Sequence, residues 1–502
     1  MPTRLAFLFA LALVPCASSR AEVTLPRLFT DRMILQRDLP IHVWGWADPR
    51  ESVSATFQNE TANAQADDLG RWSLYLKPRP AGGPYTLSVK GSNTVKVEDI
   101  LLGDVWVASG QSNMEWTLKK ADDAQAAIAA ATHPRIRFFR VDRKASNYPV
   151  DDVPETSKGW LPSTPENAPD FTAIGYFFAV DLEKTLDVPI GIIDTSWGGT
   201  PVASFTSLPA LSQDAGLMPV FAQWSKMAGR QSGIVRTNEK EDRAYERAVE
   251  EAAAKGRTKP EKKWRPNFES WSPAGIYNGM IAPVTPYAIR GAIWYQGESD
   301  ANFERAPIYS KAFQTMISGW RNDWGVGDFP FLFVQLTSYI AGPKNAWPEL
   351  REAQLETLQL TNTGMAVTLD VGTPKDIHPP YKHKVADRLA LAARAIAYGE
   401  KTEFSGPIFR QAIPEENGLR LFFDHTAGGL KAEGGRLASF EVAGEDGKFS
   451  PAEARIERDT ILVTSSNVPR PLTVRYAWAD NPVGANLYNG AGLPASPFRS
   501  SK

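Results

Sequence analysis

The sequence has almost no cysteine: its 502 residues include one, Cys16. That cysteine lies in an amino-terminal segment, residues 1–21, with an early arginine, an apolar run from Leu5 to Val14 and small residues up to Ala21. This layout is typical of a secretory signal peptide. Cleavage after Ala21 would leave a chain without cysteine, which excludes disulfide bonds and thiolate nucleophiles. We expect export to the periplasm or the extracellular space.

The chain also lacks an excess of charge of either sign and a second long apolar run. It has 55 basic and 57 acidic residues, which does not fit a nucleic-acid-binding surface. No segment after the signal peptide is long and apolar enough to span a membrane. With 43% hydrophobic and 22% charged residues, the composition is that of an ordinary globular protein. We therefore expect neither a nucleic-acid partner nor a membrane span.

Three regions follow the signal peptide. Residues 22–103 and 401–502 contain short alternating runs such as "WSLYLK" and "LRLFF", separated by turn residues, and this pattern predicts β-sandwich-like modules. Residues 104–400 contain apolar runs without alternation, which predict a parallel sheet covered by helices on both faces. Within this α/β domain, residues 213–272 are charged and helix-favouring and predict an inserted helical segment. The apolar runs of the domain begin at Val105, Ile190, Ala292, Phe331 and Ala366.

The residues that follow these runs are candidates for a site, because ligands of open α/β sheets bind beyond the carboxyl ends of the strands. The first run continues into "SGQSNMEW", in which Ser112 is followed three residues later by Glu115. Ser-x-x-Glu is the capping-box pattern of a helix start. A serine on a tight turn between strand and helix is also a place for a hydrolase nucleophile. The motif alone leaves both interpretations open.

Serine hydrolysis needs a base, a carboxylate that orients it, and N–H donors for the oxyanion. Of five histidines, only His378 follows a predicted strand with a carboxylate, Asp376, two residues away. Gly199 of "GGT" and Gln296 of "QGESD" follow two other runs. A glycine turn is the usual explanation of the first and a polar loop is one explanation of the second, but an amide after the buried "AIWY" is costly to bury without a partner. Glu298 is interpreted as structural. No metal site is predicted, since the chain has no HExxH motif and its closely spaced histidines do not share a helical face.

Four ordered motifs resemble a known family. The segments "GQSNMEW", "DTSWGGTP", "YNGMIAPVTPYAIRGAIWYQGESD" and "DIHPPYKHKVADRLA" are similar to the bacterial sialate O-acetylesterase-like carbohydrate esterases of the SGNH hydrolase superfamily. The resemblance covers residues 103–399 and implies a three-layer parallel-sheet hydrolase core that removes O-acetyl groups from sugars without a cofactor.

The resemblance also implies a role for each candidate residue. Ser112 corresponds to the nucleophile, and Asp376 and His378 correspond to the rest of the triad. The N–H groups of Ser112 and Gly199 and the side-chain amide of Gln296 correspond to the oxyanion hole.

The substrate is expected to be a neutral O-acetylated oligosaccharide such as acetylated xyloglucan. A sialate carboxylate would favour a well-placed arginine, and the motifs at the strand ends contain none, although Arg290 and Arg305 are near in sequence. Trp197 and Trp294 are the predicted platforms for sugar faces. The alternatives are a sialate 9-O-acetylesterase and, in a different class, a non-catalytic carbohydrate-binding protein.

Overall fold

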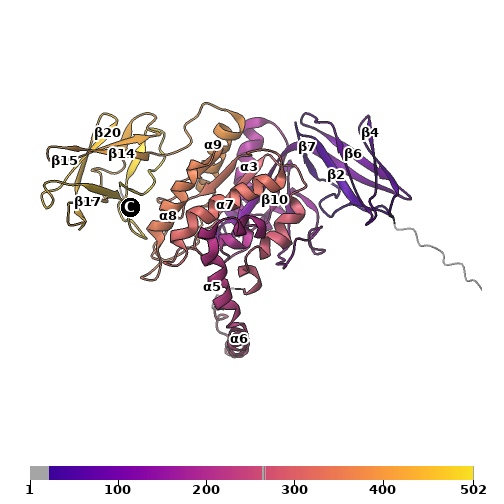
Figure 1. Cartoon of the computed structure of the whole chain (residues 1–502), viewed down its shortest axis with the longest axis horizontal. Coiled ribbons are helices and arrows are strands. Elements are labelled where there is room, and N and C mark those ends of the chain that lie inside the picture. The colour runs from indigo at the N-terminus through magenta and orange to yellow at the C-terminus, as the bar shows by residue number, and fades with distance from the viewer. Residues whose placement is uncertain (1–21, 263–264, 266, 501–502) are drawn as a thin grey trace, which may run out of the picture.

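The computed structural model describes residues 22–262, 265 and 267–500. They form an N-terminal β module, a central α/β domain and a C-terminal β module, arranged in a row (Figure 1). The predicted fold class, a parallel-sheet hydrolase core with flanking β modules, is confirmed. Residues 1–21, with the predicted signal peptide and Cys16, lie outside the described residues.

Most strands of the N-terminal module are antiparallel, and in β5 every second residue is buried, whereas β1 pairs parallel with β7 and is buried throughout. β2 pairs with β5, and β3 pairs with β4 and β6. The strands are β1 (Ile34–Gln36), β2 (Ile41–Trp46), β3 (Ser52–Phe57), β4 (Glu60–Gln65), β5 (Arg71–Leu76), β6 (Gly82–Lys90) and β7 (Thr94–Gly110).

β7 belongs to two parts of the protein. Its first half pairs with β6 of the N-terminal module, and its second half is the central strand of the α/β domain. Gly103 permits this close junction, because a Cβ there would lie 2.0 Å from the carbonyl oxygen of Pro189. The boundary placed at residue 103 in the sequence therefore falls within a continuous strand and not in a linker.

The central sheet has the order β13-β12-β11-β7-β10-β8-β9, and every pair in it is parallel except β8 with β9. The sequence predicts that a strand begins at Ala366. This prediction is wrong, because the observed strand, β13, ends at that residue. The hydroxyl of Thr368 donates to the carbonyl of Gln335, so the chain beyond β13 is held by side-chain contacts. The further strands of the sheet are β8 (His133–Arg140), β9 (Trp160–Ser163), β10 (Ile190–Asp194), β11 (Gly291–Tyr295), β12 (Phe331–Val334) and β13 (Thr363–Ala366).

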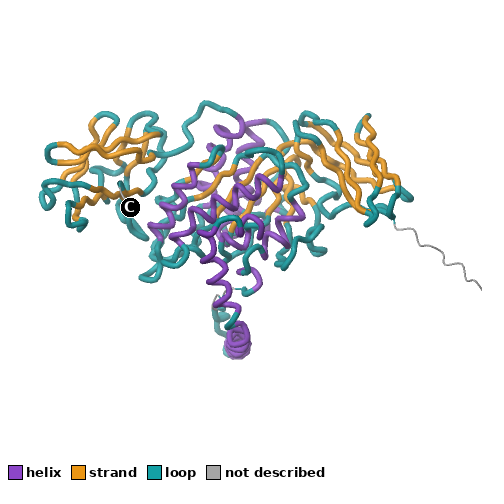
Figure 2. Tube along the Cα trace, viewed as in Figure 1, coloured by secondary structure: helices purple, strands orange, loops and turns teal. Residues whose placement is uncertain are grey.

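Helices cover both faces of this sheet, which explains why its strands lack alternation (Figure 2). On one face the ring of Trp106 in β7 contacts Phe178 of α3, and on the other Trp294 of β11 contacts Phe313 of α7. Among the described residues, no helix combines the length and hydropathy needed to cross a membrane. The helices of this domain are α1 (Ser112–Glu115), α2 (Ala124–Ala129), α3 (Ala173–Leu186), α4 (Leu208–Ser212), α5 (Met218–Ala228), α6 (Gln231–Ala254), α7 (Ala306–Trp324), α8 (Trp347–Glu356) and α9 (Lys382–Tyr398).

The predicted insertion is helical. α5 and α6 project from the central domain, and α6 buries only Ala252 among its described residues (Figure 1). α9 ends at Gly399, which has a φ of 69° in the left-handed region that glycine adopts readily.

Two arginines attach the C-terminal module to α8, one through hydrogen bonds and the other through an ion pair. Arg351 is fully buried and donates to the carbonyl oxygens of Ala479 and Asp480, while Arg499 forms a bidentate ion pair with Glu352. The strands are β14 (Ile408–Glu415), β15 (Gly418–Asp424), β16 (Leu430–Ala432), β17 (Phe440–Ala443), β18 (Ser450–Pro451), β19 (Glu453–Glu457), β20 (Thr460–Thr464), β21 (Thr473–Tyr476), β22 (Leu487–Asn489) and β23 (Phe498–Arg499).

A buried carboxylate ties the N-terminal module to the core. Asp104 of β7 is fully buried and accepts hydrogen bonds from Arg37 after β1, from Arg290 before β11 and from Tyr398 of α9. Burial by itself would raise the pKa of Asp104, but the hydrogen bond from Arg37 and the charges of both arginines outweigh it and lower the pKa. The carboxylate is therefore ionised in the folded protein.

We expect Asp104→Asn to lower the free energy of unfolding by about 1.5 to 3 kcal/mol, since it removes the buried carboxylate that accepts from Arg37 and Arg290, whose side chains are partly exposed. Urea denaturation measures this loss, and Asp68→Asn is the control, because Asp68 pairs with Arg50 in solvent. The lowered pKa means that the stabilisation is complete above about pH 4 and is lost as the pH falls through the folded-state pKa. Equal stability of the two variants at neutral pH would contradict this role of Asp104.

Candidate active site

The predicted rim exists at the carboxyl edge of the central sheet. β7 has β10 on one side and β11 on the other, so the segments that follow these three strands meet there. Ser112 follows β7, Gly198 and Gly199 follow β10, and Gln296 follows β11. The loop that carries His378 follows β13 and reaches the same edge. The contact between the imidazole of His378 and Ser112 shows this.

The hydroxyl of Ser112 lies 2.8 Å from Nε2 of His378. Ser112 is the first residue of α1, whose N-cap is Gln111 and has no side-chain capping bond. Glu115 does not turn back to this helix start; its Oε2 accepts the N–H of Gly198 at 2.8 Å. The capping-box interpretation is therefore wrong, and the serine faces a base.

His378 is placed and tuned by its surroundings. Its ring stacks on Trp116 with centroids 5.2 Å apart. Burial lowers the pKa of His378, the charge of Lys382 lowers it further, and the charge of Asp376 opposes both. The imidazole is consequently neutral in neutral solution, as a general base must be.

Asp376 faces His378 at a longer distance than the predicted triad requires. Its Oδ1 accepts the backbone N–H of His378 at 2.8 Å and lies 3.9 Å from Nδ1 of the ring. The second distance is that of an ion pair and exceeds a hydrogen bond. The structure thus forms the Ser112 to His378 contact and brings the aspartate to the correct side of the ring.

The glycine turn after β10 packs against the nucleophile. A Cβ on Gly198 would lie 3.3 Å from Cβ of Ser112, and Gly199 has a positive φ of 72°. The indole of Trp271 donates to the carbonyl of Gly199 at 2.6 Å. The N–H groups of Ser112 and Gly199 donate to no residue in the described part of the chain. They are therefore free to bind an oxyanion.

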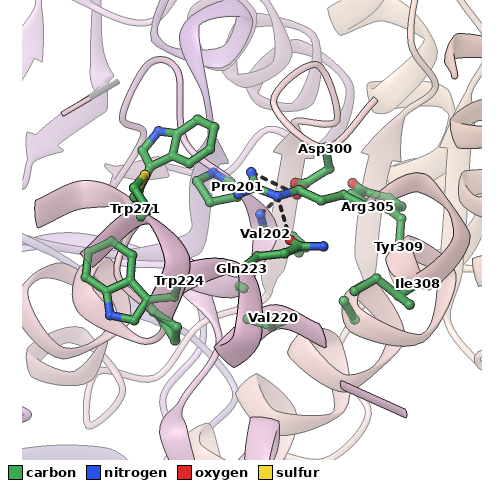
Figure 3. A pocket seen from close by; sticks show the side chains of 14 residues that line it. Pro201, Val202, Val220, Gln223, Trp224, Trp271, Asp300, Arg305, Ile308 and Tyr309 are labelled. Atoms are coloured by element: carbon green, nitrogen blue, oxygen red, sulfur yellow. Dashed lines mark hydrogen bonds and ion pairs between the residues drawn. The ribbon is translucent and has the colours of Figure 1, made fainter. Parts of the chain in front are cut away.

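Gln296 has a different role from the predicted one. It is fully buried, and its Nε2 donates to the carbonyl of Thr200 at 3.0 Å and to the carboxylate of Asp300 at 2.7 Å. An amide has two N–H hydrogens, so this structure leaves none for an oxyanion. Asp300 in turn accepts the N–H of Val202 behind the glycine turn (Figure 3). Gln296 is therefore corrected from an oxyanion donor to a support of the turn.

The predicted sugar platforms are also corrected. Trp294 is fully buried and packs against Phe205 and Trp320, because β11 is covered on both faces. Trp197 is at the rim but only 8% exposed, with the guanidinium of Arg143 5.8 Å above its ring. Trp294 belongs to the core, and Trp197 supports an arginine.

The rim carries arginines that the sequence analysis missed. Arg140 and Arg143, at and just beyond the end of β8, both contact Oε1 of Glu115. A predicted strand at β8 would have indicated that these arginines lie at the rim. β8 was not predicted, because its sequence mixes arginines with apolar residues. The two arginines considered from the sequence are elsewhere: Arg290 pairs with Asp104, and Arg305 stacks on Trp271 behind the turn (Figure 3).

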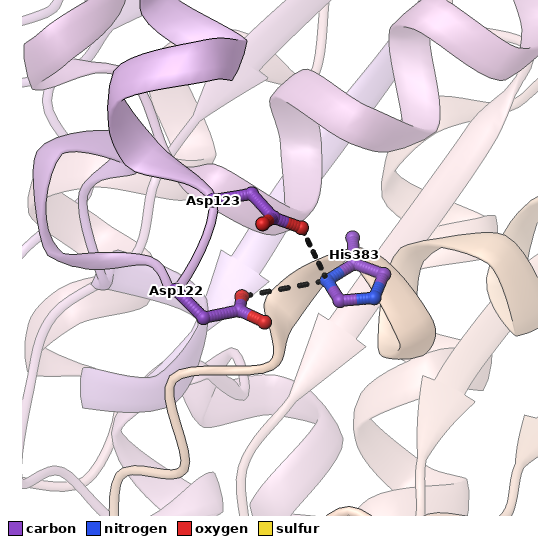
Figure 4. A group of neighbouring side chains, drawn as sticks. All are labelled: Asp122, Asp123 and His383. Atoms are coloured by element: carbon purple, nitrogen blue, oxygen red, sulfur yellow. Dashed lines mark hydrogen bonds and ion pairs between the residues drawn. The ribbon is translucent and has the colours of Figure 1, made fainter.

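The other histidines have local partners. His383 lies close to two carboxylates, with Nδ1 3.4 Å from Asp122 and 3.7 Å from Asp123 (Figure 4). The nearest atoms of these three side chains lie within 4.8 Å of one another, at an exposed place on the surface. His133 pairs with Glu183, and His425 pairs with Glu403.

A serine, an imidazole hydrogen-bonded to it and N–H groups without a described partner meet at one edge of the parallel sheet, and this arrangement fits the class of serine hydrolases. The solved structure of a carbohydrate acetylesterase from Xanthomonas citri is similar, with 38% identity and a TM-score of 0.82, over 96% of this chain and 100% of that one.

Sequence comparison identifies the family. The family model described as "Carbohydrate esterase, sialic acid-specific acetylesterase" matches residues 242–394. The sialate O-acetylesterase of Mus musculus is 30% identical over 93% of this chain and 92% of its own length. The Homo sapiens enzyme is 28% identical over 93% of this chain and 90% of its own length. The chain belongs to the sialate O-acetylesterase family and is a carbohydrate acetylesterase, as the sequence motifs predict.

We expect Ser112→Ala to lower kcat by at least about 10⁴-fold, because it removes the covalent route to the product. The melting temperature should stay close to that of the wild type, since the hydroxyl caps no helix. Hydrolysis of p-nitrophenyl acetate and thermal melting, measured on the same sample, check both statements. Preserved turnover would exclude Ser112 as the nucleophile.

Proposed function

We propose that Ser112 and His378 hydrolyse an acetyl ester in two steps. Nε2 of His378 takes the hydroxyl proton while Oγ attacks the acetyl carbonyl, and the N–H groups of Ser112 and Gly199 stabilise the oxyanion. The C–O bond to the sugar then breaks, and the imidazolium returns the proton to the leaving alkoxide. Water, activated by the same imidazole, hydrolyses the acetyl-serine and releases acetate. The hydrogen bond between Ser112 and His378 carries this assignment.

We further propose that the substrate is an O-acetylated sialic acid. The support is Arg143, whose side chain is 48% exposed at the rim and is joined through Glu115 to the N–H of Gly198. A guanidinium binds a carboxylate bidentately, so an exposed arginine this close to the nucleophile suits an acidic sugar. The names of the curated relatives agree with this choice.

A neutral O-acetylated oligosaccharide, such as acetylated xyloglucan, remains the second candidate. It was expected from the sequence because the strand-end motifs contain no arginine, and Arg140 and Arg143 remove that argument. Glu115 favours the neutral candidate, because its carboxylate already pairs with both guanidinium groups.

We expect Arg143→Met to raise KM for 9-O-acetylated sialic acid by about tenfold or more, through loss of a charge-assisted contact. Turnover of p-nitrophenyl acetate, which has no carboxylate, should stay within about twofold, as a control for the catalytic turn. The methyl ester of the same acetylated sialic acid is the matched substrate: the wild type should prefer the acid, and the variant should lose this preference. Faster wild-type turnover of acetylated xyloglucan oligosaccharides would favour the neutral candidate.

We also propose that the protein is exported, to the periplasm or beyond. The support is the signal-peptide layout of residues 1–21 and the absence of cysteine from the rest of the chain. Expression of the full chain in a Gram-negative host, followed by fractionation and amino-terminal sequencing, should recover a periplasmic or extracellular product that begins near Glu22. An uncleaved product in the cytoplasm would contradict export.

A further inference from the structure

A buried lysine lies beside the catalytic pair and has no part in the reaction steps above. Lys382, the first residue of α9, follows His378 by four positions and is fully buried. Its Nζ lies 5.5 Å from the ring centre of Trp116, the residue on which His378 stacks. It also lies 5.7 Å from the ring centre of Tyr295, at the end of β11. A lysine is rarely buried in this way unless its charge is compensated.

The direct partner of this lysine is the neighbour of the nucleophile. Nζ of Lys382 donates to Oδ1 of Asn113. Nδ2 of Asn113 donates to the carbonyl of Ile377 at 3.0 Å, immediately before His378, and to Oε1 of Glu298 at 2.6 Å. The fully buried Asn113 side chain thus joins the serine turn, the histidine loop and the loop after β11.

The carboxylate of Glu298 compensates the buried charge of Lys382 only in part. Oε2 of Glu298 is buried and has no hydrogen-bond partner in the described part of the chain. Burial raises the pKa of Glu298, and burial also lowers the pKa of Lys382 to about 7, against the charges of Glu298 and Asp376. Below neutral pH the lysine is therefore an ammonium ion beside Trp116, the ring on which the catalytic imidazole stacks.

His378 is faced by charged groups from three elements. Lys382 faces it from α9 and the exposed Lys120 from the segment after α1, and both charges oppose protonation of the ring. Asp376, from its own loop, favours protonation, and Ser112 of α1 is uncharged. Of the two lysines, Lys382 is the one held in a fixed position by a buried hydrogen bond.

We propose that Lys382 is a positioning residue of this esterase: through Asn113 it fixes the histidine loop against the serine turn, and its buried charge keeps His378 unprotonated in mildly acidic solution. This inference rests on the proposed roles of Ser112 and His378. A cation near a base makes the base weaker, so the enzyme keeps its general base at pH values where a free imidazole would be protonated. Asn113, itself hydrogen-bonded to Glu298, holds the ammonium ion in a buried position where water screens its charge little.

The test is the pH profile of kcat/KM for p-nitrophenyl acetate, measured on the full-length enzyme. In the wild type, activity should fall on the acid side with a pKa below the ordinary value of about 6.5. In Lys382→Met the pKa of this acidic limb should rise by about 0.5 to 1 pH unit, since a cation close to the imidazole is lost. kcat on the plateau should fall about tenfold, because the histidine loop loses its tie to Asn113.

Two variants serve as controls. Lys382→Arg keeps the charge, and its acidic limb should stay where it is in the wild type. Lys384→Met removes the same charge from an exposed position on α9 and should change neither the limb nor kcat. A purely structural role of Lys382 would change kcat or stability but not the limb.

Each outcome decides the inference. A folded Lys382→Met enzyme with an unshifted limb would overturn it, and so would a wild-type limb at or above 6.5. If Lys382→Met does not fold, as circular dichroism would show, Lys382→Gln is used in its place, and the wild-type limb decides if neither folds. His378→Asn separates this inference from the proposed mechanism, because an active His378→Asn enzyme would refute the mechanism itself.

Discussion

The side chain of Asn113 makes the hydrogen bonds on which the active-site geometry depends. It contacts the carbonyl before His378, the carboxylate of Glu298 and the ammonium group of Lys382. The central sheet brings these loops to one edge, but loops that follow parallel strands have no backbone ladder to hold them to one another. A buried amide with partners on two loops and on the first turn of α9 supplies that link, since each partner would be left unsatisfied if its segment moved away.

Buried charged groups lie near both ends of the core half of β7, on the strand itself at one end and on α9 at the other. At one end Asp104 accepts hydrogen bonds from Arg37 and Arg290. At the other end Asn113, the neighbour of Ser112, accepts a hydrogen bond from Lys382. The first cluster joins the N-terminal module to the core, and its carboxylate is ionised because two arginines surround it. The second has a cation whose pKa is lowered by burial. Stability governs the first environment and proton transfer governs the second, although the same strand supports both.

Glu115 connects two arginines of the rim with the glycine turn beside Ser112. One of its oxygens accepts the N–H of Gly198, and the other contacts the rim arginines Arg140 and Arg143. An anion that binds Arg143 would therefore compete with a carboxylate that also shapes the turn beside Ser112. One carboxylate is therefore shared between the arginines of the rim and the turn that packs against Ser112.

The sequence by itself determined the layered α/β core, the flanking β modules and the pairing of Ser112 with His378. Apolar runs without alternation must be covered on both faces, parallel strands bring the residues after them to one edge, and a single histidine followed such a run with a carboxylate nearby. Only the tertiary structure decided that Gln296 points into a buried network, that Trp294 is core and that Arg143 reaches the rim. The direction of a side chain at a strand end depends on partners from other segments of the chain, as Thr200 is for Gln296 and Glu115 is for Arg143, and no local pattern specifies them.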